Sequence, residues 1–268
     1  FGMGIQLRPG QMPQDVNIGK VFETLVGNTP VPFTYEVLNT GTWTAGFMLV
    51  AEQFRKGRLF IAGDAAHLFT PTGGMGYNTS VDDAVNLGWK LAAVTQGWAD
   101  DSLLDTYFIE RHPIAHRNTR FARSMAESIG RVAMPEDLEA DTPSGEQARS
   151  EVGARLLAHA RAEYNIPGVQ LGLRYVSPVI AKEAAAPPPD EPNVYVASGY
   201  PGMRAPHVPT GQPGQTLPDL FGIGFTLLSL GKGAPSADWA AHAAGLGMPL
   251  KVLSHASDEA RQVYGADL

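Results

Sequence analysis

The first part of the chain contains short apolar runs and one segment in which apolar residues keep helical spacing. Apolar and aromatic runs at residues 33–38, 43–52 and 59–62 are too short for helices and predict strands. Apolar residues keep helical spacing over residues 18–25, which predicts a helix there. We therefore expect a β-rich segment with one helix that leads into a glycine-rich loop at residues 72–76.

Helical periodicity dominates the middle of the chain. Thr79 precedes Asp82 and Asp83, an arrangement typical of an N-cap followed by an acidic first turn. Pro113 is expected to interrupt a helical stretch, because the residue before a proline is biased away from the helical region. Together these signals predict helices at residues 79–97, 102–112, 114–129 and 151–164.

Strand and helix patterns alternate again beyond a proline-rich segment at residues 184–192. Strand patterns occur at the end of residues 221–230 and at residues 250–253, and helical patterns at residues 239–244 and 257–264. Such alternation is typical of a small α/β unit with a parallel or mixed sheet. The fold class predicted for the whole chain is α/β (α+β).

Composition narrows the function classes. The chain has 268 residues, a net charge of −7 and no cysteine, which argues against nucleic acid as a partner and excludes disulfides and thiolate ligands. No apolar run reaches the roughly 20 residues of a membrane span. His67, His112 and His116 have no carboxylate cluster at ligand spacing, so no metal site is expected. No Gly-x-Ser-x-Gly elbow is present, which makes a hydrolase improbable.

The candidate ligand-binding residues follow the apolar run at residues 59–62. Asp64 follows Gly63 just past the predicted strand, where open α/β sheets place their ligands. The glycines of residues 72–76 let the backbone come close to a ligand, and the helix start beyond them presents unpaired N–H groups. The stretch offers a carboxylate for hydroxyl groups and N–H donors for an electron-rich group.

Three segments carry a family resemblance. Residues 63–67 read Gly-Asp-Ala-Ala-His, residues 71–78 read Pro-Thr-Gly-Gly-Met-Gly-Tyr-Asn, and residues 83–87 read Asp-Ala-Val-Asn-Leu. This order resembles the second flavin-binding motif of the class A flavoprotein monooxygenases, the aromatic-hydroxylase family, and the helix that follows it. Residues 202–207 read Gly-Met-Arg-Ala-Pro-His and residues 219–222 read Asp-Leu-Phe-Gly. With these segments the chain from about Val169 onward resembles the thioredoxin-like third domain of the phenol-hydroxylase and polyketide-hydroxylase branches.

The resemblance implies three parts. Residues 1–54 would be part of the substrate-binding β-sheet domain. Residues 55–165 would be the C-terminal part of the FAD-binding domain with its helices, and residues 166–268 a thioredoxin-like domain. Because the chain has no cysteine, this third part cannot have a thiol redox role.

The same resemblance implies roles for individual residues. In the family the aspartate of Gly-Asp binds the ribityl chain of FAD, the proline lies beside the flavin ring, and backbone N–H groups of the Gly-x-Asn corner face its N1/O2 edge. Pro71 is thus the one catalytic candidate. Trp43 and Phe47 are candidates for substrate contact, with core packing of the sheet an equal alternative. The cofactor-binding candidates are Asp64, Pro71, Gly74, Gly76, Tyr77 and Asn78.

The implied activity is an FAD-dependent monooxygenase. It would use NADPH or NADH and O2 to hydroxylate a phenolic or polycyclic aromatic substrate through a flavin C4a-hydroperoxide, in the cytoplasm. The alternatives are a non-catalytic module for subunit contact within such an enzyme, or a related FAD-dependent epoxidase or reductase. The substrate, the reductant and a homodimeric state stay open.

One family feature is missing from the sequence. The pyrophosphate-binding Gly-x-Gly-x-x-Gly does not occur, because Gly2 and Gly4 are followed by Leu7 at the third position. We therefore expect an internal or C-terminal piece of a longer hydroxylase.

Overall fold

A computed structural model describes residues 5, 7, 10–27, 34–42, 48–231 and 237–265 of the chain. The chain divides into two units, Phe1–Ala45 and Gly46–Leu268. In chain order the elements are η1 (Pro13–Asp15), α1 (Ile18–Val26), β1 (Leu49–Val50), β2 (Arg55–Lys56), β3 (Leu59–Phe60), η2 (Gly63–Ala65), β4 (His67–Leu68), α2 (Met75–Thr95), η3 (Asp101–Leu104), α3 (Asp105–Gly130), α4 (Pro143–Tyr164), α5 (Pro167–Leu171), η4 (Leu217–Leu220), β5 (Phe225–Ser229), α6 (Ala237–Gly245), β6 (Leu250–Ser254) and α7 (Asp258–Tyr264).

The first unit contains the predicted helix. α1 begins after Asn17, whose side chain accepts a hydrogen bond from the Lys20 N–H at 3.0 Å. The strand predicted at residues 33–38 is wrong for residues 34–38, which form no regular element. A strand needs a partner to satisfy its backbone groups, and residues 34–42 have none among the described residues. Trp43 and Phe47 lie outside the described residues.

Two short antiparallel strand pairs surround the start of the flavin-motif segment, residues 63–78, in the second unit. β1 pairs with β4, and β2 pairs with β3 in a hairpin that turns at Gly57, where φ is +60°. The strand predicted at residues 59–62 is therefore only the two residues of β3. Both pairs are short because η2 interrupts the extended chain between β3 and β4.

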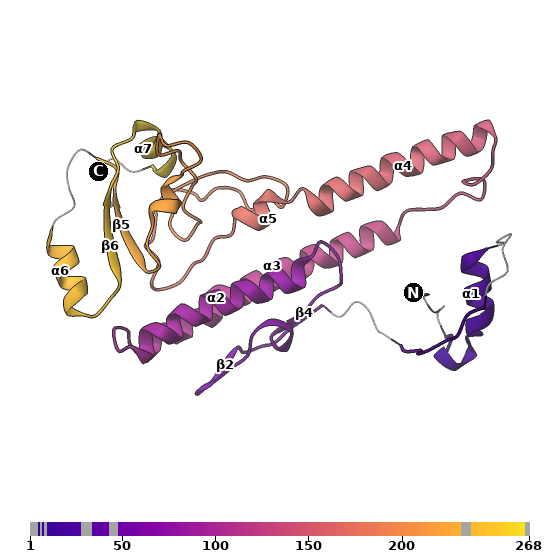
Figure 1. Ribbon diagram of the computed structural model, residues 1–268, viewed down its shortest axis with the longest axis horizontal. Helices are drawn as coiled ribbons and strands as arrows, with labels where there is room; N and C mark the ends of the chain where they lie inside the picture. Colours follow the sequence, from indigo (N-terminus) through magenta and orange to yellow (C-terminus); the bar gives the residue numbers. More distant parts are fainter. Residues whose placement is uncertain are drawn as a thin grey trace. The chain divides into compact units, whose positions relative to one another are not determined.

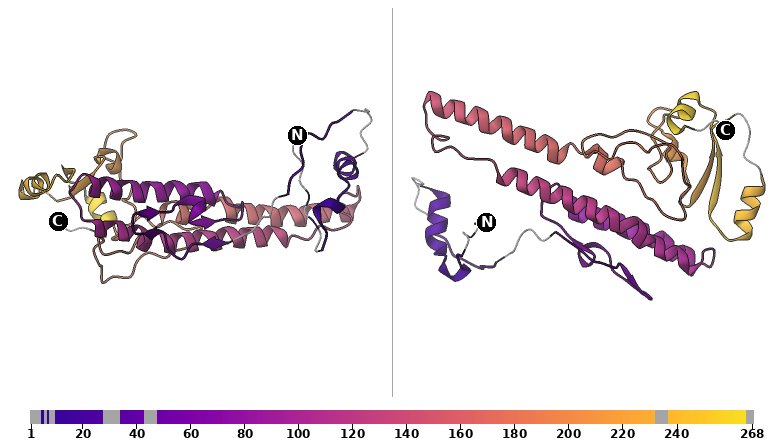
Figure 2. Two further views of the ribbon diagram at one scale, coloured as in Figure 1. Left: turned by 90° about the horizontal axis from the view of Figure 1, so that it is seen from below. Right: turned by 180° about the vertical axis from the view of Figure 1, so that it is seen from behind.

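α2 and α3 run alongside each other (Figure 1), and the rotated views agree (Figure 2). α2 begins at Met75 and not, as predicted, at Thr79, because Gly74 ends the preceding loop in the left-handed region. The predicted break at Pro113 is also wrong, since α3 continues through it. Arg111, Ile114 and Ala115 are buried around this proline, and their contacts offset its cost of about 3 kcal/mol.

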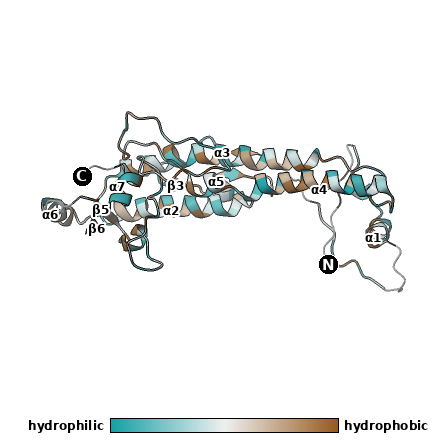
Figure 3. Ribbon diagram, turned by 90° about the horizontal axis from the view of Figure 1, so that it is seen from above, coloured by the Kyte–Doolittle hydropathy of each residue, from teal (hydrophilic) through white to brown (hydrophobic). Residues whose placement is uncertain are grey.

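α4 begins well before the predicted residue 151. Thr142 is its N-cap, with the hydroxyl oxygen 3.2 Å from the Gly145 nitrogen, and Pro143 occupies the first helical position. Hydrophilic and hydrophobic residues share each of α2, α3 and α4 (Figure 3). No helix in the described part of the chain is long and apolar enough to cross a membrane.

The last part of the second unit has the predicted alternation of strands and helices. β5 and β6 are parallel, with Phe225 opposite Leu250, and α6 lies between them in the sequence. α7 follows with Ser257 as its N-cap. The mixture of helix and sheet confirms the α/β class. The thioredoxin-like assignment and the three-part division stay predictions.

Three hydrophobic clusters hold the second unit together. One packs around Phe54 and Tyr107, one around Met75 and Phe121, and one around Leu217 in the last part of the chain. The first cluster joins the β-segments to α2 and α3, and the second joins the start of α2 to α3 and α5. They therefore support the glycine-rich loop and η2 from the buried side.

Candidate functional site

Asp64 lies in η2 with its side chain at the surface. The preceding Gly63 has φ of +58°, and a Cβ at this position would lie 3.1 Å from the Ser80 hydroxyl oxygen. A larger residue would therefore be both strained and crowded against α2. This glycine brings the carboxylate-bearing turn into close approach with the first turns of α2.

The glycine-rich loop leads into the N-terminus of α2, which has no side-chain cap. We call this the open end of α2. Gly73 and Gly74 have φ of +64° and +63°, and Gly74, as the N-cap, has no side chain to cap α2. The first N–H groups of an α-helix have no partner within the helix. Those of Met75, Gly76 and Tyr77 are therefore donors at the positive end of the helix dipole.

The predicted cofactor residues share one property in the structure: their side chains or backbones reach the surface. Tyr77 is 79% exposed, and its neighbour Asn78 donates its side-chain amide to the Gly74 carbonyl at 2.7 Å. Asp64 and Pro71 are exposed as well. The structure places Asp64, Pro71, Gly74, Gly76, Tyr77 and Asn78 on η2, the loop and the first turn of α2.

Beneath these surface groups Asp83 accepts three hydrogen bonds. They come from the Gly63 N–H at 3.0 Å, from His67 Nε2 at 2.6 Å and from Arg111 Nε at 2.7 Å. All of these groups are buried. Burial alone would raise the pKa of Asp83, but the His67 hydrogen bond and the Arg111 charge outweigh it and leave this pKa below its ordinary value.

Arg111 extends this network across α3. Its guanidinium donates to the Thr79 carbonyl at 3.1 Å and to the Tyr175 hydroxyl at 2.8 Å. Burial would lower the pKa of Arg111, yet Tyr175 and Asp83 raise it above the ordinary value. The network fixes η2, α2, α3 and the segment around Tyr175 to one another. Arg111 and Tyr175 carry no sequence signal for this contact.

A second buried network lies further along α2. Lys90 Nζ contacts Glu110 Oε2 at 2.7 Å and Asn86 Oδ1 at 2.8 Å, and the Ser177 hydroxyl donates to Glu110 Oε1 at 2.7 Å. Burial lowers the pKa of Lys90, which Glu110 opposes. Polar residues at buried positions of α2 thus hold it against α3. The Asp-Ala-Val-Asn-Leu motif contains two of these polar residues, Asp83 and Asn86.

The three histidines considered as possible metal ligands contact other side chains of the second unit. His67 is buried, with its Nδ1 atom lacking a hydrogen-bond partner among the described residues. His112 and His116 stack edge to face on α3 at 4.6 Å, and burial together with His116 lowers the pKa of His112. No group of three potential metal ligands occurs in the part of the chain that the structure describes.

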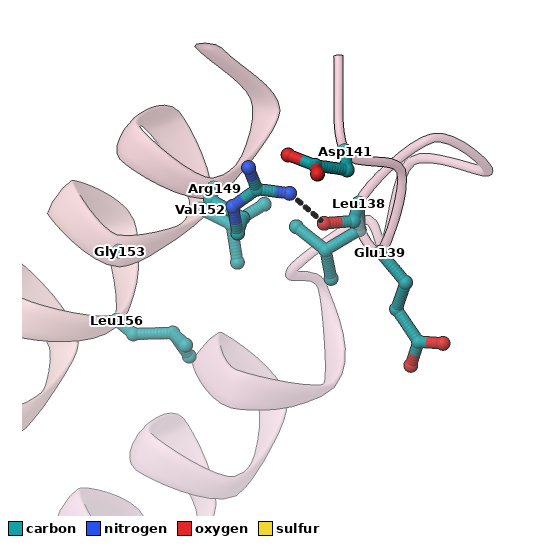
Figure 4. Close-up of a pocket in the computed structure, with 7 residues that line it drawn as sticks. All are labelled: Leu138, Glu139, Asp141, Arg149, Val152, Gly153 and Leu156. Atoms are coloured by element: carbon teal, nitrogen blue, oxygen red, sulfur yellow. Dashed lines mark hydrogen bonds between the residues drawn. The ribbon is translucent and has the colours of Figure 1, made fainter. Parts of the chain in front are cut away.

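A cavity of about 610 Å³ opens elsewhere, between α4 and the connection from α3 (Figure 4). Arg149 reaches across it and donates to the Leu138 and Ala140 carbonyls, both at 2.9 Å. None of the predicted cofactor residues lines this cavity. We therefore place the candidate site at η2, the glycine-rich loop and the first turn of α2, which carry the exposed carboxylate and the uncapped helix end, and not at this cavity.

Comparisons with known proteins find flavin-dependent enzymes. A model of the FAD binding domain family matches residues 21–122. The FAD-dependent monooxygenase apdD of Emericella nidulans is 34% identical over 91% of this chain and 41% of its own length. These matches support a class A flavoprotein monooxygenase, of which the chain covers part.

Further relatives of this flavoprotein family include solved structures. The 2,4-dichlorophenol 6-monooxygenase of Cupriavidus pinatubonensis is 37% identical over 87% of this chain and 42% of its own length. RebC with bound 7-carboxy-K252c superimposes with a TM-score of 0.74 at 36% identity, over 81% of this chain and 41% of RebC. The chain thus spans less than half the length of these relatives.

The residues present fit a flavin. The exposed Asp64 carboxylate, the left-handed glycines and the helix end without a side-chain cap match the needs of a hydroxyl-bearing chain and an electron-rich ring. This fit rests on the geometry of η2 and α2 alone.

Proposed function

We propose that the chain provides the ribityl and ring half of the FAD site in a monooxygenase. This enzyme hydroxylates phenolic or polycyclic aromatic compounds with O2, using NADPH or NADH as reductant. The observation that carries the proposal is the exposed Asp64 on η2, which the Gly63 N–H joins to the buried Asp83 of α2, together with the N-terminus of the same helix, which has no side-chain cap.

Each surface group has a role in this proposal. Asp64 accepts hydrogen bonds from ribityl hydroxyls, and the first N–H groups of α2, those of Gly76 and Tyr77 among them, stabilise the negative charge that a reduced flavin carries. Pro71 lies beside the ring. Bound FAD supplies the activation of oxygen along the route that the family resemblance implies. The protein binds and orients the reactants and excludes water.

The names of the relatives support an aromatic substrate. One relative is named for 2,4-dichlorophenol, and one solved neighbour is a ternary complex of aklavinone-11 hydroxylase with FAD and aklavinone, at 30% identity and a TM-score of 0.64. We propose that Trp43 and Phe47 face the substrate in the full-length enzyme. Residues 1–54, 55–165 and 166–268 then form the substrate-sheet, FAD-binding and thioredoxin-like parts, the last with a role in a homodimer.

The test is substrate-stimulated oxidation of NADPH or NADH by the full-length protein. Phenols and polycyclic aromatics are screened, and the product is analysed after reaction under isotopically labelled O2. The proposal expects stimulation by at least one aromatic and a labelled hydroxyl in the product. Oxidation that no aromatic stimulates would favour the reductase alternative. A protein that binds no FAD would contradict the proposal as a whole.

A further inference from the structure

Glu163, near the end of α4, contacts the glycine-rich loop. Its Oε1 atom accepts a hydrogen bond from the Gly73 N–H at 2.6 Å, across a sequence separation of 90 residues. The side chain is only 8% exposed. A carboxylate from a separate helix therefore occupies the last loop N–H before the N-cap Gly74.

His159 holds the other oxygen of this carboxylate. His159 Nε2 lies 2.8 Å from Glu163 Oε2, one helical turn away on α4, and the histidine side chain is also 8% exposed. His159 Nδ1 lies 3.2 Å from the Ser128 hydroxyl oxygen on α3. Glu163 is thus fixed on both oxygens and has little freedom to leave the loop.

Further contacts attach the same loop to α3. The Thr72 hydroxyl donates to the Ala122 carbonyl at 2.5 Å, and a Cβ at Gly73 would lie 3.4 Å from the Phe121 ring. The loop is therefore attached to both long helices. The carboxylate of Glu163 provides the one charged contact among these attachments.

This contact has two physical consequences. It fixes the orientation of the peptide that precedes two left-handed glycines, and so the direction of the open end of α2. It also places negative charge next to the positive end of the α2 dipole, where the charge opposes the binding of another anion. A group that becomes anionic on reduction is therefore bound less favourably in its reduced form.

On the basis of the proposed flavin site, we propose that Glu163, held by His159, is a positioning residue for the glycine-rich loop. It sets the direction of the N–H donors of α2 and lowers the preference of the site for reduced over oxidised flavin. Neither residue belongs to the motif that identifies the family.

The test uses the full-length protein with three substitutions. Glu163→Gln keeps a carbonyl acceptor for the Gly73 N–H and removes the charge, whereas Glu163→Ala removes both. Glu151→Gln is the matched control, because Glu151 lies on the exposed side of α4 and, among the described residues, its carboxylate accepts a hydrogen bond from the Gln147 side chain at 2.9 Å. The measurements are the FAD dissociation constant, the flavin absorption spectrum and the two-electron reduction potential against reference dyes.

We expect Glu163→Ala to weaken oxidised FAD binding about tenfold, as a lost hydrogen bond to a charged group would. Glu163→Gln retains the affinity for oxidised FAD and raises the ratio of reduced to oxidised affinity about tenfold, which is a rise of about 30 mV in the two-electron potential. Glu151→Gln leaves every measurement unchanged.

Other results overturn the inference. If Glu163→Gln leaves the potential and spectrum as in the wild type, the carboxylate does not act on the flavin. If Glu163→Gln fails to fold, its role is purely structural and the positioning proposal is wrong. Wild-type protein that binds no FAD would overturn both this inference and the proposed function, whereas wild-type binding with unaltered variants would overturn this inference alone.

Discussion

Replacing Asp83 with asparagine tests whether the buried network supports the site. The substitution keeps the size of the side chain and removes its charge. Arg111 would then stay buried with its remaining carboxylate partner, Asp82, at 3.8 Å and 55% exposed. The new amide group would also place a donor against one of the donors from His67, Gly63 or Arg111.

The expected cost follows from this geometry. Removing one partner of a buried ion pair costs about 3–5 kcal/mol, because the other charge is left without compensation. A loss of this size is a large part of the roughly 5–15 kcal/mol that stabilises a typical protein. At about 2–4 °C for each kcal/mol in chains of this size class, the melting temperature should fall by roughly 6–20 °C.

The assay is unfolding by heat and by urea, followed by circular dichroism at a helical wavelength. Asp82→Asn is the control, since it is the same change at the neighbouring position with a largely exposed side chain. It should cost less than about 1 kcal/mol. If Asp83→Asn costs no more than Asp82→Asn, the network does not stabilise this part of the fold.

Three further predictions concern the surroundings of single residues. Gly88→Ala should raise stability by roughly 0.5–1 kcal/mol in thermal unfolding, because a Cβ there meets nothing within 4 Å in the described structure; destabilisation would contradict an open helix face. The pKa of Asp83 is lowered by folding, so its stabilisation is complete above the unfolded value near 3.8 and is lost as the pH falls through the folded value. In urea unfolding, the difference in the free energy of unfolding between wild type and Asp83→Asn should therefore become smaller below about pH 4. A difference that does not change with pH would contradict a lowered pKa of Asp83 in the folded protein. Asp190→Ala removes a two-oxygen contact from Arg117, whose guanidinium keeps the Gly168 carbonyl at 3.1 Å, and should cost about 1 kcal/mol or less in the same assay because Asp190 is 62% exposed; a much larger loss would mean that solvent does not screen this pair.

The sequence predicts the glycine-rich loop better than it predicts the boundaries of the elements. The motif at residues 63–78 identifies the loop because glycines with left-handed φ and a carboxylate at a strand end are local requirements. The predicted start of α2 at Thr79 is wrong because Thr79 has the residue type of an N-cap, whereas in the structure it is buried and its hydroxyl oxygen accepts a hydrogen bond from the Asn118 side chain at 3.0 Å. Tertiary contacts outweigh that local signal.

Contacts over long sequence separations carry no such local signal. Arg111 meets Tyr175 and Glu163 meets Gly73 only once the helices are packed, and neither pair has a spacing that a sequence pattern reveals. The continuous helix through Pro113 has no local signal for the same reason, since the buried residues around the proline compensate for its missing hydrogen bond.

The central claim is that the exposed carboxylate on η2 belongs to a flavin site. The most direct measurement is FAD titration of the full-length protein, followed by flavin fluorescence, for the wild type, Asp64→Ala and the control Asp141→Ala on the exposed connection before α4. We predict a loss of about tenfold or more in FAD affinity for Asp64→Ala, as expected for removing a charged acceptor, and none for the control. An affinity for FAD that Asp64→Ala leaves unchanged would contradict the account.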